Sequence, residues 1–262
     1  MEMRDRVVVV TGGASGVGRA LCRRFAEEGA AAVVVVDVDQ GAAGAVAAEV
    51  DGTAAIADVT DEPAVRRLVE QTLERHGRLD VYCSNAGVAF GGGPEAPDDA
   101  WRRSWEVHVM AHVYAARAVL PAMLERGEGY IVGTVSAAAL LNHVFASPYA
   151  TTKAAALSFF EWLAIAYGDR GIRVSAVCPQ GVRTPMLARE GERSFLATGA
   201  LGPEQVASVV LEAMRAERFL VLPHPEVAEY VRRKAEDTDR WLRGMRRLRS
   251  RVIGSTESLS ES

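Results

Sequence analysis

The segment RVVVVTGGASGVGRALCRRFAEEGA, residues 6–30, sets a run of valines directly before a cluster of glycines and a helix-like stretch. A short, continuous run of β-branched residues is typical of a parallel strand that is buried on both faces. Gly12, Gly16 and Gly18 follow the run, and glycine permits a tight turn and a close approach of backbone to a pyrophosphate. The helix that begins there offers free N–H groups and a partial positive charge. The segment therefore predicts a strand, a phosphate-binding loop and a helix.

Runs of the same kind recur along the chain: AAVVVVD (31–37), TAAIAD (53–58), LDVYCSNAG (79–87), YIVGTVS (130–136) and IRVSAVCP (172–179). Helical periodicity lies between them, as in residues 60–77, where Thr60 or Asp61 can cap a helix and Gly77 can end it. Strands that alternate regularly with helices predict an α/β, Rossmann-like, doubly wound parallel sheet with helices on both faces. Ligands of such sheets bind beyond the carboxyl ends of the strands, near the point where the strand order reverses.

The length fits one large α/β domain or two small ones, and the composition is typical of a soluble globular protein with a sizeable core. The chain has 262 residues, of which 49% are hydrophobic and 24% charged, and its net charge of −4 gives no overall attraction to nucleic acid or to an anionic membrane. Cys22, Cys83 and Cys178 are far apart and lack metal-type spacing, so we expect reduced cysteines and no metal site. We find neither a signal-peptide core nor a run of 18 apolar residues, and we expect a cytoplasmic protein. We expect a single domain over 1–250, including a basic C-terminal helix, and a disordered tail over 251–262.

An acidic residue, Asp37, ends the second predicted strand, about the twenty residues beyond the glycines that are typical of dinucleotide-binding units. A carboxylate there accepts hydrogen bonds from ribose hydroxyls and repels a 2′-phosphate. Its neighbour Val38 offers no cation to such a phosphate, and Ser15 in the loop is not basic either. A turn or capping role is the plainer explanation of Asp37 alone. Together with the glycine loop, it predicts NAD as the cofactor, with NADP the less favoured of the two.

The segment SPYATTK, residues 147–153, sets a tyrosine and a lysine four positions apart in a helix-like stretch. Lys153 is one of only two lysines among 30 basic residues, so this chain keeps lysine where arginine does not serve. On a helix, the Tyr149 hydroxyl and the Lys153 ammonium share a face, and a nearby cation lowers the pKa of a phenol. Taken alone, these seven residues favour a plain surface pair on an amphipathic helix.

Taken together, these motifs resemble the short-chain dehydrogenase/reductase family, in its single-domain oxidoreductase branch, over about residues 5–225. The phosphate loop T-G-x-x-x-G-x-G, the N-A-G stretch after the fourth strand and the catalytic S-x12-Y-x3-K are all matched, and Ser136, Tyr149 and Lys153 fall in register. The resemblance implies a set of dinucleotide-binding residues: Thr11, Gly12, Ser15, Gly16, Val17, Gly18, Asp37, Asp58, Val59, Asn85, Ala86, Gly87, Tyr149, Lys153, Pro179, Val182 and Thr184.

The resemblance also implies a reaction, which is hydride transfer at the nicotinamide C4 coupled to proton transfer at a substrate oxygen. Tyr149 would exchange the proton, Lys153 would ease its loss and hold the nicotinamide ribose, and Ser136 would orient the reacting oxygen; a strand-end cap is the alternative for Ser136. We expect an NAD(H)-dependent oxidoreductase that interconverts a secondary alcohol and a ketone on a small, apolar substrate. The alternative is a dinucleotide-binding redox sensor without turnover, which the loss of Tyr149 or Lys153 would have indicated.

Two residues depart from the family pattern. Gln180 stands where a glycine usually follows the proline, and His108 stands where a helix usually carries a catalytic-site asparagine. We expect His108 to maintain a proton path in the catalytic site as a neutral ring, because the Lys153 cation disfavours imidazolium. The alternative is that His108 merely packs where the asparagine packed.

Apolar residues around Tyr149 and after the sixth strand predict the substrate pocket. The candidates for its walls are His143, Val144, Phe145, Met186 and Leu187, with Leu140, Leu141, Phe195 and Leu196 as further apolar neighbours.

Two surfaces indicate partners. Broad apolar faces over 101–127 and 148–168 predict a homodimer or homotetramer, because members of the family commonly pair through these helices.

The stretch RWLRGMRRLRSR (240–251) has the pattern of a basic amphipathic helix. We interpret it as packing on its own core or on a second subunit rather than on nucleic acid or a membrane, although the composition alone fits those partners too.

Overall fold

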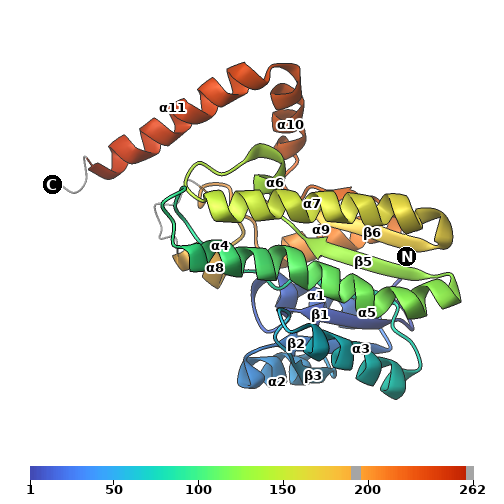
Figure 1. Cartoon of the computed structure of the whole chain (residues 1–262). Helices are drawn as coiled ribbons and strands as arrows, with labels where there is room; N and C mark the ends of the chain where they lie inside the picture. Colours follow the sequence, from blue (N-terminus) through green and yellow to red (C-terminus); the bar gives the residue numbers. More distant parts are fainter. Residues whose placement is uncertain (190–195, 258–262) are drawn as a thin grey trace.

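The sheet at the centre of the molecule has seven parallel strands in the order β3-β2-β1-β4-β5-β6-β7 (Figure 1). The computed structural model describes residues 1–189 and 196–257. The strands are β1 (Val7–Thr11), β2 (Ala32–Asp37), β3 (Thr53–Ile56), β4 (Val81–Ser84), β5 (Gly129–Thr134), β6 (Ile172–Val177) and β7 (Leu220–Val221). The strand order reverses between β1 and β4, and the predicted doubly wound parallel sheet is confirmed.

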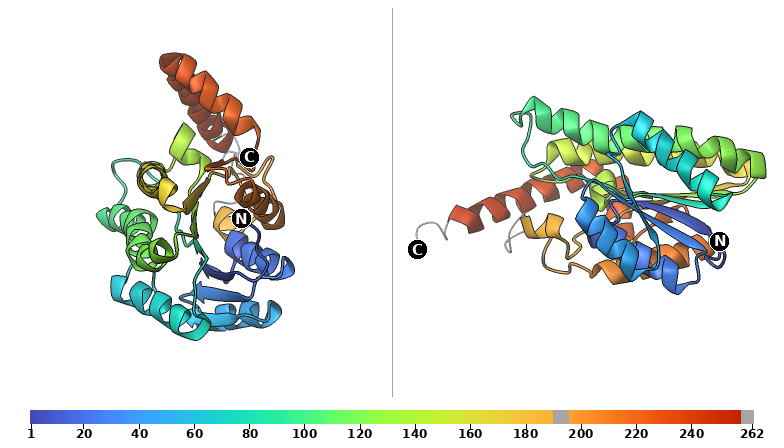
Figure 2. Two further views of the ribbon diagram at one scale, coloured as in Figure 1. Left: turned by 90° about the vertical axis from the view of Figure 1, so that its right-hand side faces the viewer. Right: turned by 90° about the horizontal axis from the view of Figure 1, so that it is seen from below.

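Helices cover both faces of the sheet (Figure 2). One core lies under α1 (Gly16–Glu27), α2 (Gln40–Glu49) and α9 (Pro203–Arg215), and the other lies under α3 (Glu62–His76), α5 (Ala111–Arg126) and α7 (Ser147–Tyr167). Shorter helical elements are α4 (Asp98–Trp105), η1 (Glu106–Met110), α6 (Ala137–Leu141), η2 (Gly168–Arg170) and α8 (Pro185–Arg189).

The valine run in β1 shows why the sequence folds this way. Val8 and Val10 point into the core under α1, whereas Val9 points into the core under α3 and α5, and all are fully buried. A strand whose successive side chains alternate between two cores needs an apolar residue at every position. The predicted helix over 60–77 is also present: α3 begins after Asp61 and ends at Gly77, whose φ of +72° suits glycine.

A single turn of π-helix, η1, joins α4 to α5 without a break and carries His108. Such turns are rare and occur often at functional sites. The continuous segment Asp98–Arg126 is long and apolar enough to cross a membrane by length and composition. In this structure it packs against α3 and α7 as a core helix of the domain.

The C-terminal helices α10 (Glu226–Glu236) and α11 (Thr238–Glu257) form an arm that extends from the body of the domain (Figures 1 and 2). We expected a disordered tail over 251–262, but α11 continues to Glu257; residues 258–262 lie outside the described part of the chain. The main helix packing of α11 is against α10, and most of its side chains are exposed. It packs on its own subunit near its start, where Trp241 lies against the small core cluster of Ala137, Leu141 and Val227.

Candidate active site

The candidate site lies at the carboxyl ends of β1, β4 and β5, where Asn85 connects the three strands. The Asn85 backbone N–H donates to Thr11 Oγ1 at 2.9 Å, and its side-chain Nδ2 donates to the Thr11 carbonyl at 3.0 Å. The Thr134 hydroxyl donates to Asn85 Oδ1 at 2.9 Å. This network lies at the point where the strand order reverses, and doubly wound sheets bind ligands in a crevice at that point.

The glycine loop lies directly against this network. A Cβ on Gly12, whose φ is +62°, would lie 2.9 Å from Ala86 Cα, and a Cβ on Gly18 would lie 2.1 Å from the Gly12 carbonyl oxygen. Both positions therefore require glycine, and the loop leads into the N-terminus of α1 at Gly16. Thr184 reaches the same place, because its Cγ2 lies 3.0 Å from where a Cβ on Gly16 would be.

The other predicted loop residues take positions that agree with this arrangement. Ser15 is the residue before the first turn of α1, and Val17 packs against the core under that helix. Gly87 faces α7, since a Cβ on it would lie 3.9 Å from Lys153 Nζ. The Pro179 carbonyl accepts a hydrogen bond from Ala137 N at 2.8 Å, which holds the segment that begins at Pro179 against α6.

Two carboxylates flank the loop on the β2 and β3 side. Asp37 accepts from Ala14 N at 3.2 Å and from Val38 N at 2.8 Å, so its carboxylate is held over the glycine loop by backbone groups. Asp58 accepts from the Thr60 N–H and hydroxyl. Burial opposes ionisation of Asp58, but its hydrogen bonds from Thr60 outweigh it, and the pKa of Asp58 lies below its ordinary value. Val59 follows Asp58 and is half-buried.

Ser136, Tyr149 and Lys153 come from two elements beside this crevice. Ser136 follows β5, and Tyr149 and Lys153 occupy the first two turns of α7. Lys153 is 3% exposed; its Nζ donates to the Thr134 carbonyl at 2.8 Å and lies 5.8 Å from the centroid of the Tyr149 ring. Burial lowers the pKa of Lys153 to about 8.

The Ser136 side chain serves as a cap in this structure. Its Oγ accepts from Ala138 N at 3.1 Å at the start of α6. The capping role that the sequence offered as the alternative for Ser136 is therefore present. This contact uses a lone pair and not the hydroxyl hydrogen, because an N–H can only donate. The same bond orients Ser136 Oγ, and the O–H remains able to donate to a reacting oxygen.

His108 is fully buried, and both of its ring nitrogens are engaged. Val88 N donates to Nε2 at 3.2 Å, and Nδ1 lies 2.9 Å from Thr152 Oγ1. Because the Thr152 hydroxyl donates to the Pro148 carbonyl at 2.8 Å, we assign the His108 proton to Nδ1, which donates to Thr152. Burial first, and the Lys153 charge second, hold the pKa of His108 well below its ordinary value.

The His108 ring also meets Tyr149 edge to face, with the ring centroids 5.4 Å apart and the planes at 88°. It therefore braces the first turns of α7 against the loop after β4. This bracing is a positioning role that is distinct from the proton path expected from sequence.

Sequence reasoning missed two histidines. His112, one helical turn beyond His108, is buried with Nδ1 2.6 Å from Ser84 Oγ, and burial followed by the Lys153 charge lowers its pKa to about 3. The spacing of the two histidines in HVMAH was the available signal. The second, His224, accepts from Gln180 N at 3.1 Å and so fixes the residue that departs from the family pattern. Nothing in the local sequence connects these two positions.

The predicted substrate-pocket residues fall in two places at the same edge of the sheet. His143, Val144 and Phe145 lie in the loop before α7, where Gly92 N donates to the Phe145 carbonyl at 2.8 Å. Met186 and Leu187 lie on α8 (Figure 1). Phe195, which we also expected at the pocket, lies outside the described residues, and Leu196 begins the described part that follows.

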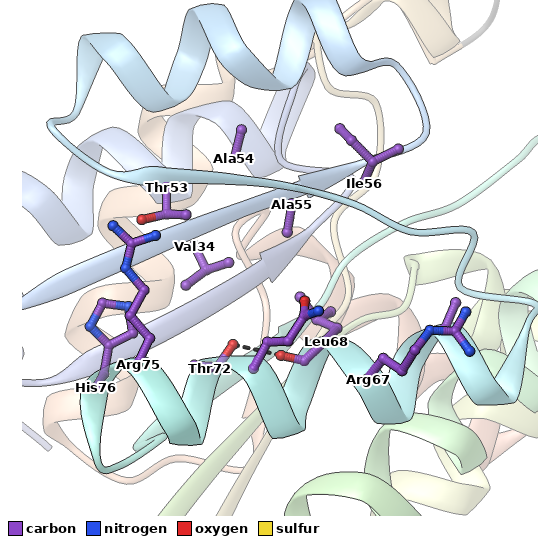
Figure 3. A pocket seen from close by; sticks show the side chains of 12 residues that line it. Val34, Thr53, Ala54, Ala55, Ile56, Arg67, Leu68, Thr72, Arg75 and His76 are labelled. Carbon is purple, nitrogen blue, oxygen red and sulfur yellow. Dashed lines mark hydrogen bonds between the residues drawn. The ribbon is translucent and has the colours of Figure 1, made fainter.

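A hollow of about 500 Å³ lies elsewhere, between the edge strand β3 and α3 (Figure 3). Arg75 and His76 stand at one end of it, and the Thr72 hydroxyl near its floor donates to the Leu68 carbonyl at 2.8 Å. None of the predicted catalytic residues lines it, so we place the site at the crevice beside Asn85 and not here. Within residues 1–189 and 196–257, no group of three or more His, Cys, Asp or Glu residues is arranged to hold a metal.

Comparisons with known proteins agree with this geometry. A family model described as "short chain dehydrogenase" matches residues 6–194. The chain is 40% identical over 253 residues to 1-deoxy-11-beta-hydroxypentalenate dehydrogenase of Streptomyces arenae (90% of this chain, 89% of the relative). It is 35% identical over 221 residues to meso-2,3-butanediol dehydrogenase of Serratia marcescens (80% and 87%). The crystal structure of a short-chain dehydrogenase/reductase from Burkholderia phymatum in complex with NAD superimposes with a TM-score of 0.85 at 29% identity, covering 91% of this chain and 96% of that one.

The contacts of His108 generate a prediction about its role. His108→Leu keeps the bulk but loses the bonds to Val88 N and Thr152, so α7 shifts and the turnover number falls about 10- to 100-fold. His108→Asn, which retains a donor and an acceptor, keeps substantial activity. Steady-state kinetics together with the Kd for NADH check this, since neither change touches the glycine loop.

Full activity in His108→Leu would show that the ring contributes neither position nor a proton path. An equal loss in His108→Leu and His108→Asn would show that imidazole itself is required.

Proposed function

The chain belongs to the short-chain dehydrogenase family, and we propose that it is an NAD(H)-dependent oxidoreductase that interconverts a secondary alcohol and a ketone on a small, apolar substrate. The observation that carries this proposal is the buried Lys153 ammonium beside the Tyr149 ring, at the edge of the crevice that Asn85 and the glycine loop form. A buried lysine ammonium beside a tyrosine ring is an arrangement suited to proton transfer.

The residues present fit a nicotinamide dinucleotide. The glycine loop has no room for a Cβ at Gly12 or Gly18, which keeps its backbone accessible to a pyrophosphate, and α1 begins in the same loop at Gly16. Asp37 is held by backbone N–H groups with lone pairs left for ribose hydroxyls. The segment over 179–184 would hold the carboxamide end, since Thr184 approaches the loop and Val182 pairs with Leu201 in an isolated bridge. When bound, the nicotinamide accepts or supplies the hydride.

The chain's own residues then handle the proton. In the oxidation direction, the Tyr149 phenolate takes the proton of the substrate alcohol and becomes a phenol, and the Lys153 cation favours the phenolate form that starts this transfer. Ser136 donates its hydroxyl hydrogen to the reacting oxygen, because its own oxygen is engaged by Ala138 N. His108 and Thr152 hold the turn of α7 from which Tyr149 projects. Reduction reverses the same steps.

The substrate class rests on the apolar residues at the edge of the site and on the relatives. Val144 and Phe145 are half-buried in the loop that precedes Tyr149, and Met186 and Leu187 follow the carboxamide segment. The relatives described above are named as dehydrogenases of a hydroxypentalenate and of 2,3-butanediol, which are hydroxylated compounds. Apolar walls with few polar groups are usual for small-molecule pockets.

We expect a screen of secondary alcohols with NAD and of ketones with NADH, followed by nicotinamide absorbance, to find turnover on apolar compounds. Turnover restricted to sugars contradicts the apolar substrate class. Tight NADH binding with no turnover on any compound favours the alternative, a redox sensor.

The preference for NAD over NADP rests on Asp37. Its carboxylate lies over the loop and would repel a 2′-phosphate, and Val38, which is 65% exposed, offers no cation there. Exchanging the charge at these two positions therefore tests the preference directly.

We predict that Asp37→Ala combined with Val38→Arg shifts the ratio of kcat/KM for NAD to that for NADP toward NADP by at least about tenfold, because an attractive charge replaces a repulsive one. Asp39→Ala is the matched control: this neighbouring carboxylate caps α2 through Ala42 N and is expected to leave the ratio unchanged. A wild-type enzyme that already prefers NADP would contradict the assignment to Asp37.

We include self-association and a cytoplasmic location in the proposal, with no nucleic acid or membrane partner. Trp162 and Ile165 on α7 are 55% and 82% exposed, and Trp105 on α4 is 48% exposed. Large apolar side chains exposed on core helices are typical of surfaces that a second copy covers. Light scattering at micromolar concentration tests for the dimer or tetramer, and a strict monomer contradicts it.

A further inference from the structure

The C-terminal arm is anchored to the segment that connects Ser136 to Tyr149. A small apolar cluster joins α6 to the arm, with Leu141 and Val227 buried and Trp241 packed against them. Lys234 Nζ donates to the carbonyl of Leu140 at the end of α6, and Tyr230 contacts the Trp241 ring. Because α6 begins directly after Ser136, the arm is attached beside the catalytic residues and not at a remote edge.

The far half of α11 returns to the same segment. The Arg249 guanidinium lies 5.2 Å from the centroid of the Phe145 ring, four residues before Tyr149. The arm extends past the edge of the sheet that carries the site (Figures 1 and 2). The loop under Arg249 is itself tied to the loop after β4, because Ser147 N donates to the Gly92 carbonyl at 2.8 Å. Arg249 therefore lies against the loop that leads into Tyr149.

The other side chains of α11 separate into two faces. Half-buried Trp241, Met245, Leu248 and Val252 follow one another at helical spacing, and Arg249 lies beside this row. Four other arginines of α11 line a hollow on another face of the helix, together with Ser250: Arg243, Arg246, Arg247 and Arg251. Arg249 does not line this hollow, and its guanidinium instead lies over Phe145 in the loop before α7.

Arg249 has no ion pair or hydrogen bond with any residue in the described part of the chain, and its side chain is exposed. The pKa of Glu95 is lowered mainly by backbone hydrogen bonds, one of which runs from Gly93 N to Oε1 at 2.8 Å. The Arg249 charge adds a smaller contribution in the same direction. The guanidinium therefore keeps its donors while resting on an aromatic ring, and a planar fork of donors is suited to a carboxylate.

The geometry points to Arg249 as a specificity-determining residue that binds a carboxylate on the substrate. The substrate class is then an apolar secondary alcohol or ketone with a carboxylate at the end remote from the reacting carbon. This inference rests on the proposed function. The apolar part contacts Phe145 and its neighbours, and the carboxylate stays at the exposed rim, where it need not be desolvated.

The test compares NADH-dependent reduction of 9-oxodecanoate, its methyl ester and 2-decanone. The wild type should prefer the acid to the ester by about tenfold or more in kcat/KM. Arg249→Ala should remove that preference by raising KM for the acid with little change in kcat, and should leave 2-decanone unaffected. Arg247→Ala, which removes an arginine from the other face, is the matched control and should keep the preference. Both residues are exposed, so neither change threatens the fold.

Equal kcat/KM for acid and ester in the wild type, or equal losses in Arg249→Ala and Arg247→Ala, would overturn the inference and leave the proposed oxidoreductase intact. If no ketone is reduced at all, the proposed function fails. Calorimetry with decanoate and methyl decanoate then decides the inference alone: binding of decanoate that Arg249→Ala abolishes supports it, and absence of such binding overturns it.

Discussion

The hydrogen bonds of Asn85 are the constraint on which the rest of the site depends. One side chain binds the end of β1 through the Thr11 carbonyl and the end of β5 through the Thr134 hydroxyl, and its residue directly follows β4. The Thr134 carbonyl in turn accepts from Lys153. A continuous chain of bonds thus runs from the strand that feeds the glycine loop to the lysine beside Tyr149. The glycine loop and the residues that we propose for proton transfer are thus held in one rigid frame, which the proposed transfer between cofactor and substrate requires.

The second property of the site is one buried cation among neutral neighbours. Lys153 is almost fully buried with its pKa lowered to about 8, and burial together with the lysine charge lowers the pKa of both His108 and His112, which keeps these histidines neutral. Imidazolium there would repel Lys153 in a region of low dielectric. Lys153 is therefore the positive charge beside Tyr149, and the histidines around it are neutral. One of them, His108, is positioned by the π-helical turn η1.

The parts of this structure that the sequence predicted are those with a repeating or local cause. The valine run, the glycines and the spacing of Tyr149 and Lys153 each follow from strand or helix geometry, so sheet, loop and catalytic helix could all be placed. The contacts of His108 and the pairing of His224 with Gln180 join residues far apart in the chain, and no local pattern encodes them. The arm was predicted as a basic helix, but its attachment to α6 depends on packing across the fold, and its end at Glu257 lies beyond the predicted boundary.

Separating cofactor binding from proton transfer at Tyr149 tests the central claim most directly. Tyr149→Phe removes one oxygen atom and keeps the ring that meets His108. NADH affinity, measured by fluorescence titration, should stay within about threefold of the wild type, while kcat on a ketone that the wild type reduces should fall at least about a hundredfold, in line with the loss of a general acid. Retention of full kcat in Tyr149→Phe would contradict the account.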